Sequence, residues 1–473
     1  MLLLGIDLGT SSIKVSIVDA ATNFCIASTQ YPETEVDIIS VQHGWAEQSP
    51  DLWWEHVKQA VLKCNSSNLY NPLDIAAIGI AYQMHGLVLV DNEQKVLRNS
   101  IIWCDGRAVN IGERAFSEIG EEKCLSHLLN SPGNFTASKL AWVKENEPEI
   151  YDRIDKIMLP GDFISMKFSG ETTTTISALS EGIFWDFKNH SLSKDVLSLF
   201  GFSESFIPKI QPLFSSHGYL RETVATRLGL KAGIPITYKA GDQLNNAFSL
   251  NVLEPGEVAA TAGTSGVIYG VSDHAGYDPQ SRINSFAHVN HLTPGPSPSQ
   301  LERGDRGEVR IGVLLCINGA GIFNRWTRNL VGSQYSYDSL NQKASSIAPG
   351  SDGLFMLPFG NGAERMLNNK IVGSHFHNLD FNVHTFKHIV RTAQEGIAFA
   401  FRYGIDIMRE NGMAPTAIRA GKTNMFLSEV FTQTFVNVTG VPVELYKTDG
   451  SIGAAFGAGV GLGYFDRPSA PFL

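Results

Sequence analysis

Residues 2–18 read LLLGIDLGTSSIKVSIV, two apolar runs separated by a short polar turn. The runs Leu2–Leu8 and Ile13–Val18 have the composition of buried strands, and Gly9-Thr10-Ser11-Ser12 has the glycine and small hydroxyl residues of a tight turn. We therefore predict a β-hairpin with a polar tip at the start of the chain.

Asp7 lies at the end of the first predicted strand, directly before the turn. Backbone N–H groups of such a turn can bind phosphate oxygens, and a neighbouring carboxylate can hold Mg²⁺. This pattern indicates a phosphate site, with an ordinary hairpin as the alternative.

A second hairpin of the same kind is predicted half a chain later. Glu257–Thr261 and Val267–Tyr269 read as strands around Gly263-Thr264-Ser265. Two such units are consistent with duplication of one domain, a weak signal with only two copies.

The rest of the chain alternates strand and helix patterns. Ile75–Ala81 and Leu87–Val90 read as buried strands, Asp51–Lys63 and Lys387–Glu410 carry apolar residues at helical spacing, and Gly412 follows where the second helix would end. The predicted class is α/β.

The length, charge and cysteine content of the chain limit its possible domain number, partners and compartment. With 473 residues the chain has room for two to four domains of ~100–200 residues each. A formal net charge of −10 does not favour nucleic acid or an anionic membrane as a partner. Five scattered cysteines without a C-x-x-C pair are typical of reduced thiols in a cytoplasm.

Residues 291–310 read HLTPGPSPSQLERGDRGEVR and lack an apolar face. We expect a flexible Pro-rich insertion over about 292–309 without a catalytic role, and a polyproline ligand for a partner is the alternative.

Gly241-Asp242-Gln243 places a carboxylate between a glycine and polar amides, about twenty residues before the second turn. Asp242 is a candidate general base for a substrate hydroxyl. A helix N-cap is the alternative role, and both can hold at once.

Three other patterns do not carry a site. Gly421-Lys422-Thr423 lacks the leading glycine of a P-loop, and Gly457–Gly463 lacks the spacing of a dinucleotide fingerprint. His384 and His388 have metal-ligand spacing but no H-E-x-x-H carboxylate, so we do not expect a metal there.

A set of motifs resembles the FGGY family of carbohydrate kinases, and within it most closely the xylulose kinases. They are GIDLGTSSIK (5–14), GWAEQSPDLWW (44–54), QMHG (83–86), WCDGRA (103–108), TASKLAWVKENEPEI (136–150), GDQLNNAF (241–248), TAGTSG (261–266) and DGSIGAAFGAG (449–459). The resemblance implies an actin/hexokinase-like (ribonuclease H-like) α/β fold with two domains, here 1–239 for the sugar and 240–473 for the nucleotide, and an active-site cleft between them.

The resemblance also implies roles for individual residues. Asp242 matches the catalytic base and Asp7 the Mg²⁺-associated aspartate. The matches to sugar-binding positions are Met84, His85, Trp103, Asp105, Asp242 and Gln243. The matches to ATP-binding positions are Gly9, Thr10, Ser11, Gly263, Thr264, Ser265, Gly421, Gly450 and Gly453. Of the family's Gly-Gly-Gly-Ala stretch near the adenosine, only Gly421 is kept, in Arg419-Ala420-Gly421-Lys422.

The implied activity is ATP-dependent phosphorylation of the terminal hydroxyl of a ketose, with D-xylulose as the expected substrate and Mg²⁺ as cofactor. L-ribulose, sedoheptulose and glycerol stay open as acceptors, because Gln243 stands where xylulose kinases usually carry Asn. A sugar- or nucleotide-binding protein with little turnover is a second alternative, and an actin- or Hsp70-like assembly protein a third. We expect a cytoplasmic enzyme without nucleic-acid or membrane partners, and a homodimer is a candidate assembly.

Overall fold

The computed structural model describes residues 1–291 and 309–465 of the chain. Backbone contacts divide it into two compact units: unit 1 is Met1–Leu253, Phe286–Ile311 and Asp449–Leu473, and unit 2 is Glu254–Ser285 and Gly312–Thr448. The predicted domain boundary, between residues 239 and 240, lies inside unit 1. The two predicted domains therefore differ from these units and stay a prediction. The predicted insertion at 292–309 lies, except for its last residue, outside the described residues.

Unit 1 is built on a five-stranded sheet with strand order β13-β5-β1-β2-β3. Its strands are β1 (Leu2–Leu8), β2 (Ile13–Asp19), β3 (Phe24–Tyr31), β5 (Ile75–Tyr82) and β13 (Ile236–Gly241). β1, β2 and β3 pair antiparallel, whereas β5 and β13 join in parallel. Every residue of β1 is buried except Asp7, which is half-buried, so its carboxylate is the polar exception in an apolar strand.

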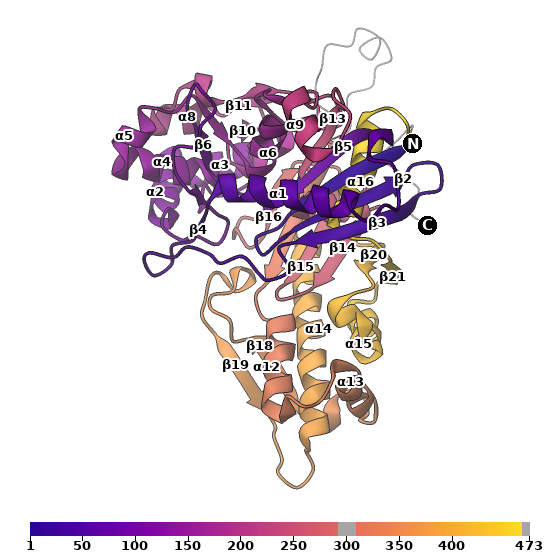
Figure 1. Cartoon of the computed structure of the whole chain (residues 1–473). Helices are drawn as coiled ribbons and strands as arrows, with labels where there is room; N and C mark the ends of the chain where they lie inside the picture. Colours follow the sequence, from indigo (N-terminus) through magenta and orange to yellow (C-terminus); the bar gives the residue numbers. More distant parts are fainter. Residues whose placement is uncertain (292–308, 466–473) are drawn as a thin grey trace. The chain divides into compact units, whose positions relative to one another are not determined.

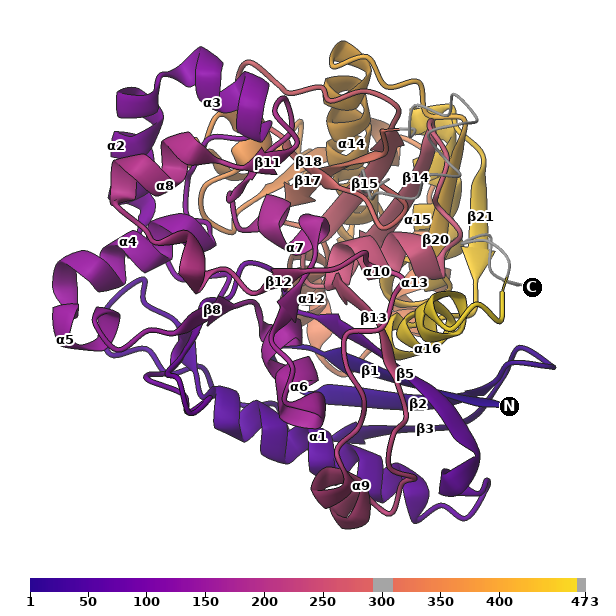
Figure 2. The same cartoon turned by 90° about the horizontal axis from the view of Figure 1, so that it is seen from above.

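Helices cover both faces of this sheet. Helix α1 (Pro50–Asn65) packs on β2 and β3, and α16 (Gly450–Gly461) packs on β1, β5 and β13 from the opposite side (Figures 1 and 2). The buried apolar residues of the strands, α1 and α6 (Pro160–Ser169) form one core cluster. This core holds the ends of β1, β5 and β13 in place, and the predicted site residues follow those ends.

The remaining elements of unit 1 lie in the connections. The short strands are β4 (Glu47–Gln48), β6 (Val88–Val90), β7 (Ser100–Ile101), β8 (Lys156–Met158), β9 (Thr173–Thr174), β10 (Trp185–Asp186), β11 (Ser191–Leu192) and β12 (Lys209–Ile210). The helices are α2 (Val109–Ile119), α3 (Glu121–Leu128), α4 (Thr136–Asn146), α5 (Pro148–Tyr151), α7 (Ile176–Glu181), α8 (Lys194–Phe200), α9 (Glu222–Leu228) and α10 (Asp242–Ser249).

Unit 2 repeats the strand arrangement in a six-stranded sheet with order β16-β17-β15-β14-β20-β21. Its elements are β14 (Glu257–Ala262), β15 (Gly266–Ser272), β16 (Asn284–Ala287), β17 (Ile311–Ile317), α12 (Gly321–Gly332), α13 (Tyr337–Ser345), β18 (Phe355–Phe359), β19 (Gly373–His377), α14 (Phe386–Glu410), β20 (Ala417–Gly421), α15 (Glu429–Thr439) and β21 (Val443–Tyr446). β14 and β15 form an antiparallel hairpin around the Gly263-Thr264-Ser265 turn, and β20 and β21 join in parallel. This topology matches that of the first hairpin with its parallel neighbours, as a duplication predicts.

The predicted elements are confirmed, with small changes at their ends. Both hairpins, β5 and α1 lie where the sequence pattern places them. Helix α14 ends at Glu410, and Gly412 has a φ of 85°, a left-handed conformation that suits glycine after a helix. The α/β class is therefore confirmed.

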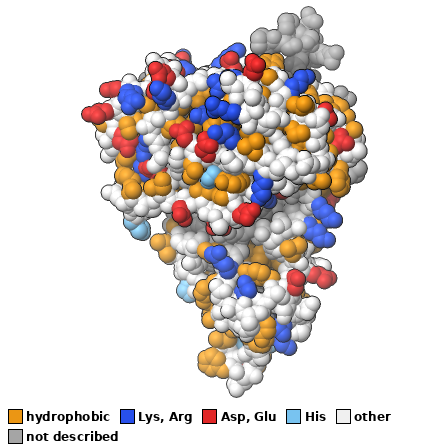
Figure 3. Space-filling model, in the orientation of Figure 1, with side chains coloured by type: hydrophobic (Ala, Val, Ile, Leu, Met, Phe, Trp, Pro, Cys, Tyr) orange, Lys and Arg blue, Asp and Glu red, His pale blue; other side chains and the backbone are white. Residues whose placement is uncertain are grey.

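One face of the molecule carries mixed charge. On the face drawn in Figure 3, Lys and Arg side chains are interspersed with Asp and Glu side chains. Among the described residues, no helix combines the length and the apolar character that crossing a membrane requires. Because positive and negative charges are interspersed on the face in Figure 3, an anionic ligand would depend on local groups for its binding there.

Candidate active site

The first predicted phosphate turn is held by side chains from three other segments. The Gly9 N–H donates to the Ser12 carbonyl at 3.1 Å and closes the turn. The Thr10 hydroxyl accepts from the Trp103 indole N–H at 2.9 Å and donates to Gln83 Oε1 at 3.2 Å. The Gln48 amide donates to the Thr10 carbonyl at 2.8 Å. Trp103, half of which is exposed, thus supports the turn, and our sequence analysis missed Gln48 and Gln83.

Asp7 lies against the first residue of α16. A Cβ added at Gly450 would lie 2.3 Å from Asp7 Oδ2, so only glycine lets the helix approach this carboxylate. The Asn245 side-chain amide donates to the Gly450 carbonyl at 2.8 Å and fixes this arrangement. Gly453 is buried against Ser249 of α10, where it permits close helix packing. The predicted nucleotide contacts of Gly450 and Gly453 stay predictions.

Asp449 caps the same helix. Its carboxylate accepts from the Ser451 and Ile452 N–H groups, both at 3.0 Å, and lies 3.6 Å from Lys14 Nζ. The register of the hairpin pairs Lys14 with Asp7 across β1 and β2. Asp7, Asp449 and Lys14 therefore form one charged group at the end of the hairpin.

Asp242 is the first residue of α10, directly after β13. Gly241 takes the N-cap position and no side-chain cap bond forms, so the N-cap alternative for Asp242 is wrong. The cause is that the helix begins at Asp242, one residue earlier than an N-cap role for Asp242 requires. Gln243, next in the chain, has a buried side-chain oxygen for which the described residues provide no hydrogen-bond partner. A ligand hydroxyl could satisfy that oxygen.

Both aspartates bind protons more tightly than usual. Burial raises the pKa of Asp7 to about 6, with a further increase from Asp449 and an opposing effect of Lys14. Burial raises the pKa of Asp242 to about 7, the charge of Asp7 adds to this, and hydrogen bonds from Gln243 oppose it. A carboxyl group with a pKa near neutrality is suited to accept a proton during catalysis.

The raised pKa of Asp242 predicts how folding stability depends on pH. The folded-state pKa of about 7 exceeds the ordinary value of 3.8, so this group's stabilisation is complete below pH 3.8 and is lost as the pH rises through 7. From about pH 4 to about pH 8, the free energy of unfolding of the wild type should fall by about 2–4 kcal/mol relative to Asp242→Asn. Urea unfolding of both proteins across this range measures the difference. A difference that is constant with pH would mean an ordinary pKa.

Met84 and His85 follow the end of β5, beside Gly241. Met84 is buried, and a Cβ added at Gly241 would lie 2.7 Å from Met84 Cγ and 2.6 Å from Glu181 Oε2. His85 has a left-handed φ of 60°, and its Nδ1 lies 3.0 Å from the Glu181 carbonyl. Because a carbonyl only accepts, Nδ1 carries a proton in this hydrogen bond. The structure thus brings Met84, His85 and Asp242 together.

Glu181 is a further acidic group here that our sequence analysis missed. It is the last residue of α7 and its side chain is fully buried. Burial raises the pKa of Glu181 well above its usual range, and the charge of Asp242 adds to this shift. A lone Glu in an unremarkable sequence carries no signal that could have identified it.

Asp105 is engaged inside unit 1. Its carboxylate accepts from the Ala46 N–H at 2.5 Å and from Arg107 Nη2 at 2.7 Å. The Arg107 guanidinium also lies 2.7 Å from Glu47 and 3.9 Å from the centre of the Trp45 ring. These contacts give Asp105 a role in holding its loop, and its predicted contact with a sugar stays a prediction.

In unit 2 the second phosphate turn meets the start of α12. The N–H groups of Gly321 and Ile322 donate to the carbonyls of Gly263 and Thr264 at 2.7 and 3.0 Å. A Cβ added at Gly321 would lie 2.2 Å from the Gly263 carbonyl oxygen, so glycine is required there. The turn is therefore fixed by the backbone of a helix start.

A cavity of about 410 Å³ opens beside this turn, within the size range of small-ligand sites. Gly263 and Thr264 line it, and its other polar lining residues are Asn324, Arg325, Tyr337, Asp338, Asn341, Thr423, Asn424 and Ser428. Ser265 and Gly421 are not among its lining residues, although Gly421 ends β20 two residues before Thr423. The lining residues on α12 and α13 could not be identified from the sequence, because these helices lie far from the turn along the chain.

The altered segment Arg419–Lys422 adds no backbone strain. None of its residues has a φ in the left-handed region, so the loss of the family's glycines requires no unusual conformation. Arg419 instead forms ion pairs at 2.8 Å with Glu257 and with Glu444 on the neighbouring strands. The Arg419 side chain thus links β20 to its two neighbouring strands, β14 and β21, in the sheet of unit 2.

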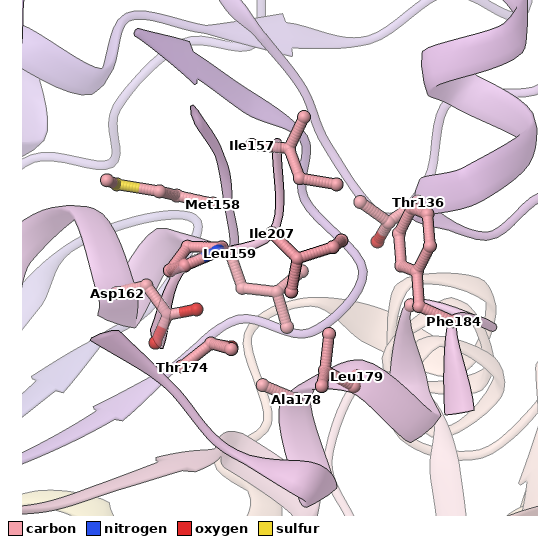
Figure 4. A pocket seen from close by; sticks show the side chains of 12 residues that line it. Thr136, Ile157, Met158, Leu159, Asp162, Thr174, Ala178, Leu179, Phe184 and Ile207 are labelled. Atoms are coloured by element: carbon pink, nitrogen blue, oxygen red, sulfur yellow. The ribbon is translucent and has the colours of Figure 1, made fainter. Parts of the chain in front are cut away.

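Figure 4 shows a second space, enclosed in unit 1 by Thr136, Met158, Asp162, Leu179 and other side chains. Its volume of about 20 Å³ is enough for about one water molecule. It is too small for a sugar or a nucleotide.

Comparison with known proteins identifies the family. Residues 2–249 match the N-terminal domain of the FGGY family of carbohydrate kinases. Two curated relatives are the xylulose kinases of Escherichia coli (strain K12), 28% identical over 96% of this chain and 88% of the relative, and of Bacillus subtilis (strain 168), 28% identical over 98% and 89%. The crystal structure of xylulose kinase from Rhodospirillum rubrum is 24% identical, covers 100% of this chain and 92% of that chain, and has a TM-score of 0.85. This likeness confirms the predicted two-domain actin/hexokinase-like fold. Because the family match spans more than half of the 473 residues, the chain belongs to the FGGY family of carbohydrate kinases, which are phosphotransferases.

Proposed function

We propose that this kinase transfers the γ-phosphate of ATP to the terminal hydroxyl of D-xylulose. The observation that carries the proposal is Asp242, a carboxyl group with a pKa of about 7 at the start of α10, close to Met84 and Gln243. The printed names of the curated relatives, xylulose kinases, support the choice of sugar.

In the proposed reaction, Asp242 accepts the proton of the sugar hydroxyl as its oxygen attacks the γ-phosphorus. The new O–P bond forms as the bond between the γ-phosphorus and the β–γ bridging oxygen breaks, and ADP leaves with that oxygen. Sugar hydroxyls bind His85 and Gln243, and the second phosphate turn and its cavity in unit 2 bind the nucleotide. Positioning supplies much of the rate enhancement, as in other phosphoryl transfers.

The residues around Asp7 fit a magnesium ion. Asp7 and Asp449 supply carboxylate oxygens, the ligand type that Mg²⁺ prefers, and burial together with repulsion from Asp449 raises the pKa of Asp7. A cation would relieve that repulsion. We therefore assign Asp7 to hold Mg²⁺, which when bound neutralises charge on the phosphate oxygens.

We also propose a cellular compartment and an oligomeric state for the enzyme. We place it in the cytoplasm, because ATP is its phosphate donor and its five cysteines are scattered without a C-x-x-C pair. A homodimer is the assembly that we propose to test, by light scattering of the purified protein.

A panel of acceptors tests the choice of sugar. ADP release is measured with D-xylulose, L-ribulose, sedoheptulose and glycerol, and we expect the highest kcat/KM with D-xylulose. L-ribulose, sedoheptulose and glycerol are the second candidates, because Gln243 stands where xylulose kinases usually carry Asn. A tenfold higher kcat/KM with one of them would reassign the substrate, and ADP release that no acceptor stimulates would reject the kinase reaction.

We predict that His85→Asn raises the sugar KM by about 3–10-fold and leaves the ATP KM unchanged. Loss of one hydrogen bond to a neutral hydroxyl costs ~0.5–1.5 kcal/mol. Asn tolerates the left-handed backbone of His85, so the substitution tests the ring and not the turn. Steady-state kinetics with each substrate varied measure both constants.

The matched control is His190→Asn. His190 also has a left-handed φ, of 49°, but it is exposed in the turn between β10 and β11. We expect its replacement to change neither constant. Equal shifts of both Michaelis constants in His85→Asn, or lower stability with unchanged sugar kinetics, would place His85 in the scaffold.

A further inference from the structure

Lys139 is a fully buried lysine in α4, within the TASKLAWVKENEPEI motif to which our sequence analysis gave no chemical role. Its Nζ donates to the His85 carbonyl at 2.8 Å and to the Ile102 carbonyl at 3.0 Å. One ammonium group therefore links two backbone segments that are distant in sequence.

Both segments carry residues of the proposed sugar site. The His85 carbonyl belongs to the turn that presents Met84 and the His85 ring, and the Ile102 carbonyl comes directly before Trp103. The Phe135 ring, one residue before α4, lies edge-on to the His85 ring with centroids 4.8 Å apart. The start of α4 thus contacts the turn through both Phe135 and Lys139.

The turn itself has an uncommon backbone conformation. His85 has a φ of 60°, in the left-handed region that few residues other than glycine adopt. The hydrogen bond between the His85 ring and the Glu181 carbonyl holds the ring, and the bond from Lys139 holds the backbone. Together they fix the direction in which the ring points.

The burial of Lys139 is costly for folding. Within residues 1–291 and 309–465, no carboxylate forms an ion pair with Lys139 Nζ. The charge of Asp105 affects Lys139 only from a longer distance. Burial lowers the pKa of Lys139 to about 7, and the charge of Asp105 opposes this effect. A methionine of similar length would fill the same space without a buried charge. This cost favours a functional role over a packing role.

We propose that Lys139 is a positioning residue of the sugar site, which holds the His85 turn and the Trp103 loop in the geometry that binds substrate. The inference rests on the proposed function, because it takes the sugar to bind at His85. Without the ammonium group both loops would sample more conformations, and the sugar would have to order them on binding. Removal of the Lys139 ammonium group should therefore raise the sugar KM.

The test compares Lys139→Met with Lys144→Met. Lys144 lies on the same helix and its Nζ also donates to two carbonyls, of Phe200 at 2.6 Å and Gly201 at 2.8 Å, but these belong to the end of α8. We expect Lys139→Met to raise the sugar KM about 5–20-fold, with the ATP KM within about twofold of wild type. Lys144→Met should change neither constant. Thermal melting verifies that each variant is folded.

An unchanged sugar KM in folded Lys139→Met, or equal shifts of both Michaelis constants, would overturn the proposal. If Lys139→Met does not fold, Lys139→Gln keeps a polar group at the position, and the same outcomes apply. Failure of both variants to fold would make Lys139 a structural residue and would also overturn it. If the wild type prefers another acceptor, the proposed substrate fails, and the same variants are tested with that acceptor. A wild type that phosphorylates none of the acceptors overturns both proposals.

Discussion

Asp242→Asn is expected to lower kcat by ~10²–10⁴-fold while the dissociation constant of the sugar stays within about threefold of wild type. Asn keeps the shape and polarity of the side chain but cannot accept a proton. Because Asp242 does not cap α10, its replacement removes no cap hydrogen bond from the helix. Single-turnover kinetics give the chemical step, and calorimetric titration gives the sugar affinity.

The stability of this variant provides a second readout. Burial disfavours the charged form of Asp242, so a neutral isostere should not lower the melting temperature. Asp195→Asn is the control, since Asp195 also lies in the first turn of a helix, α8, but forms a surface ion pair with Lys123. A variant that keeps more than about a third of wild-type turnover would assign the general base to another residue.

Asp7→Asn should lower turnover at a fixed Mg²⁺ concentration by ~10²-fold or more and raise the Mg²⁺ concentration needed for half-maximal rate. The change removes one of the two carboxylates that we assign to the metal region and leaves Asp449 with its cap bonds. Magnesium titrations of the initial rate measure the effect.

The same substitution should stabilise the protein without ligands. Burial and the charge of Asp449 raise the pKa of Asp7 from 3.8 to about 6, so the carboxylate destabilises the fold at neutral pH by up to roughly 3 kcal/mol. Asp19→Asn is the control, because Asp19 lies at the opposite end of the same hairpin. An unchanged magnesium requirement in Asp7→Asn would remove Asp7 from the metal site.

Local sequence patterns were sufficient to predict both hairpins and the strands β5 and β6. The alternation of apolar runs with Gly-Thr-Ser turns depends on neighbouring residues, and the structure has both hairpins where these runs lie. Asp7 and Asp242 could be predicted as site residues because each is a carboxylate that ends or follows an apolar strand. The family resemblance supplied Met84 and His85.

Residues whose role depends on distant contacts could not be predicted. Lys139 and Glu181 reach the His85 turn only because α4 and the end of α7 contact this turn, and no local pattern distinguishes them from surface charges. The cavity beside the second turn likewise combines α12, α13 and the segment after β20. The N-cap alternative for Asp242 failed because a helix start can shift by one residue without a change in sequence pattern.

In the proposed reaction the protein moves a phosphoryl group from ATP to a sugar. Phosphorus-31 NMR of a reaction with ATP, Mg²⁺ and D-xylulose follows ADP and the new phosphate ester in the same sample. We expect ADP and xylulose 5-phosphate in equal amounts with the wild type, and much slower formation of both products with Asp242→Asn. ADP accompanied only by inorganic phosphate, or no ADP beyond that formed without sugar, would contradict it.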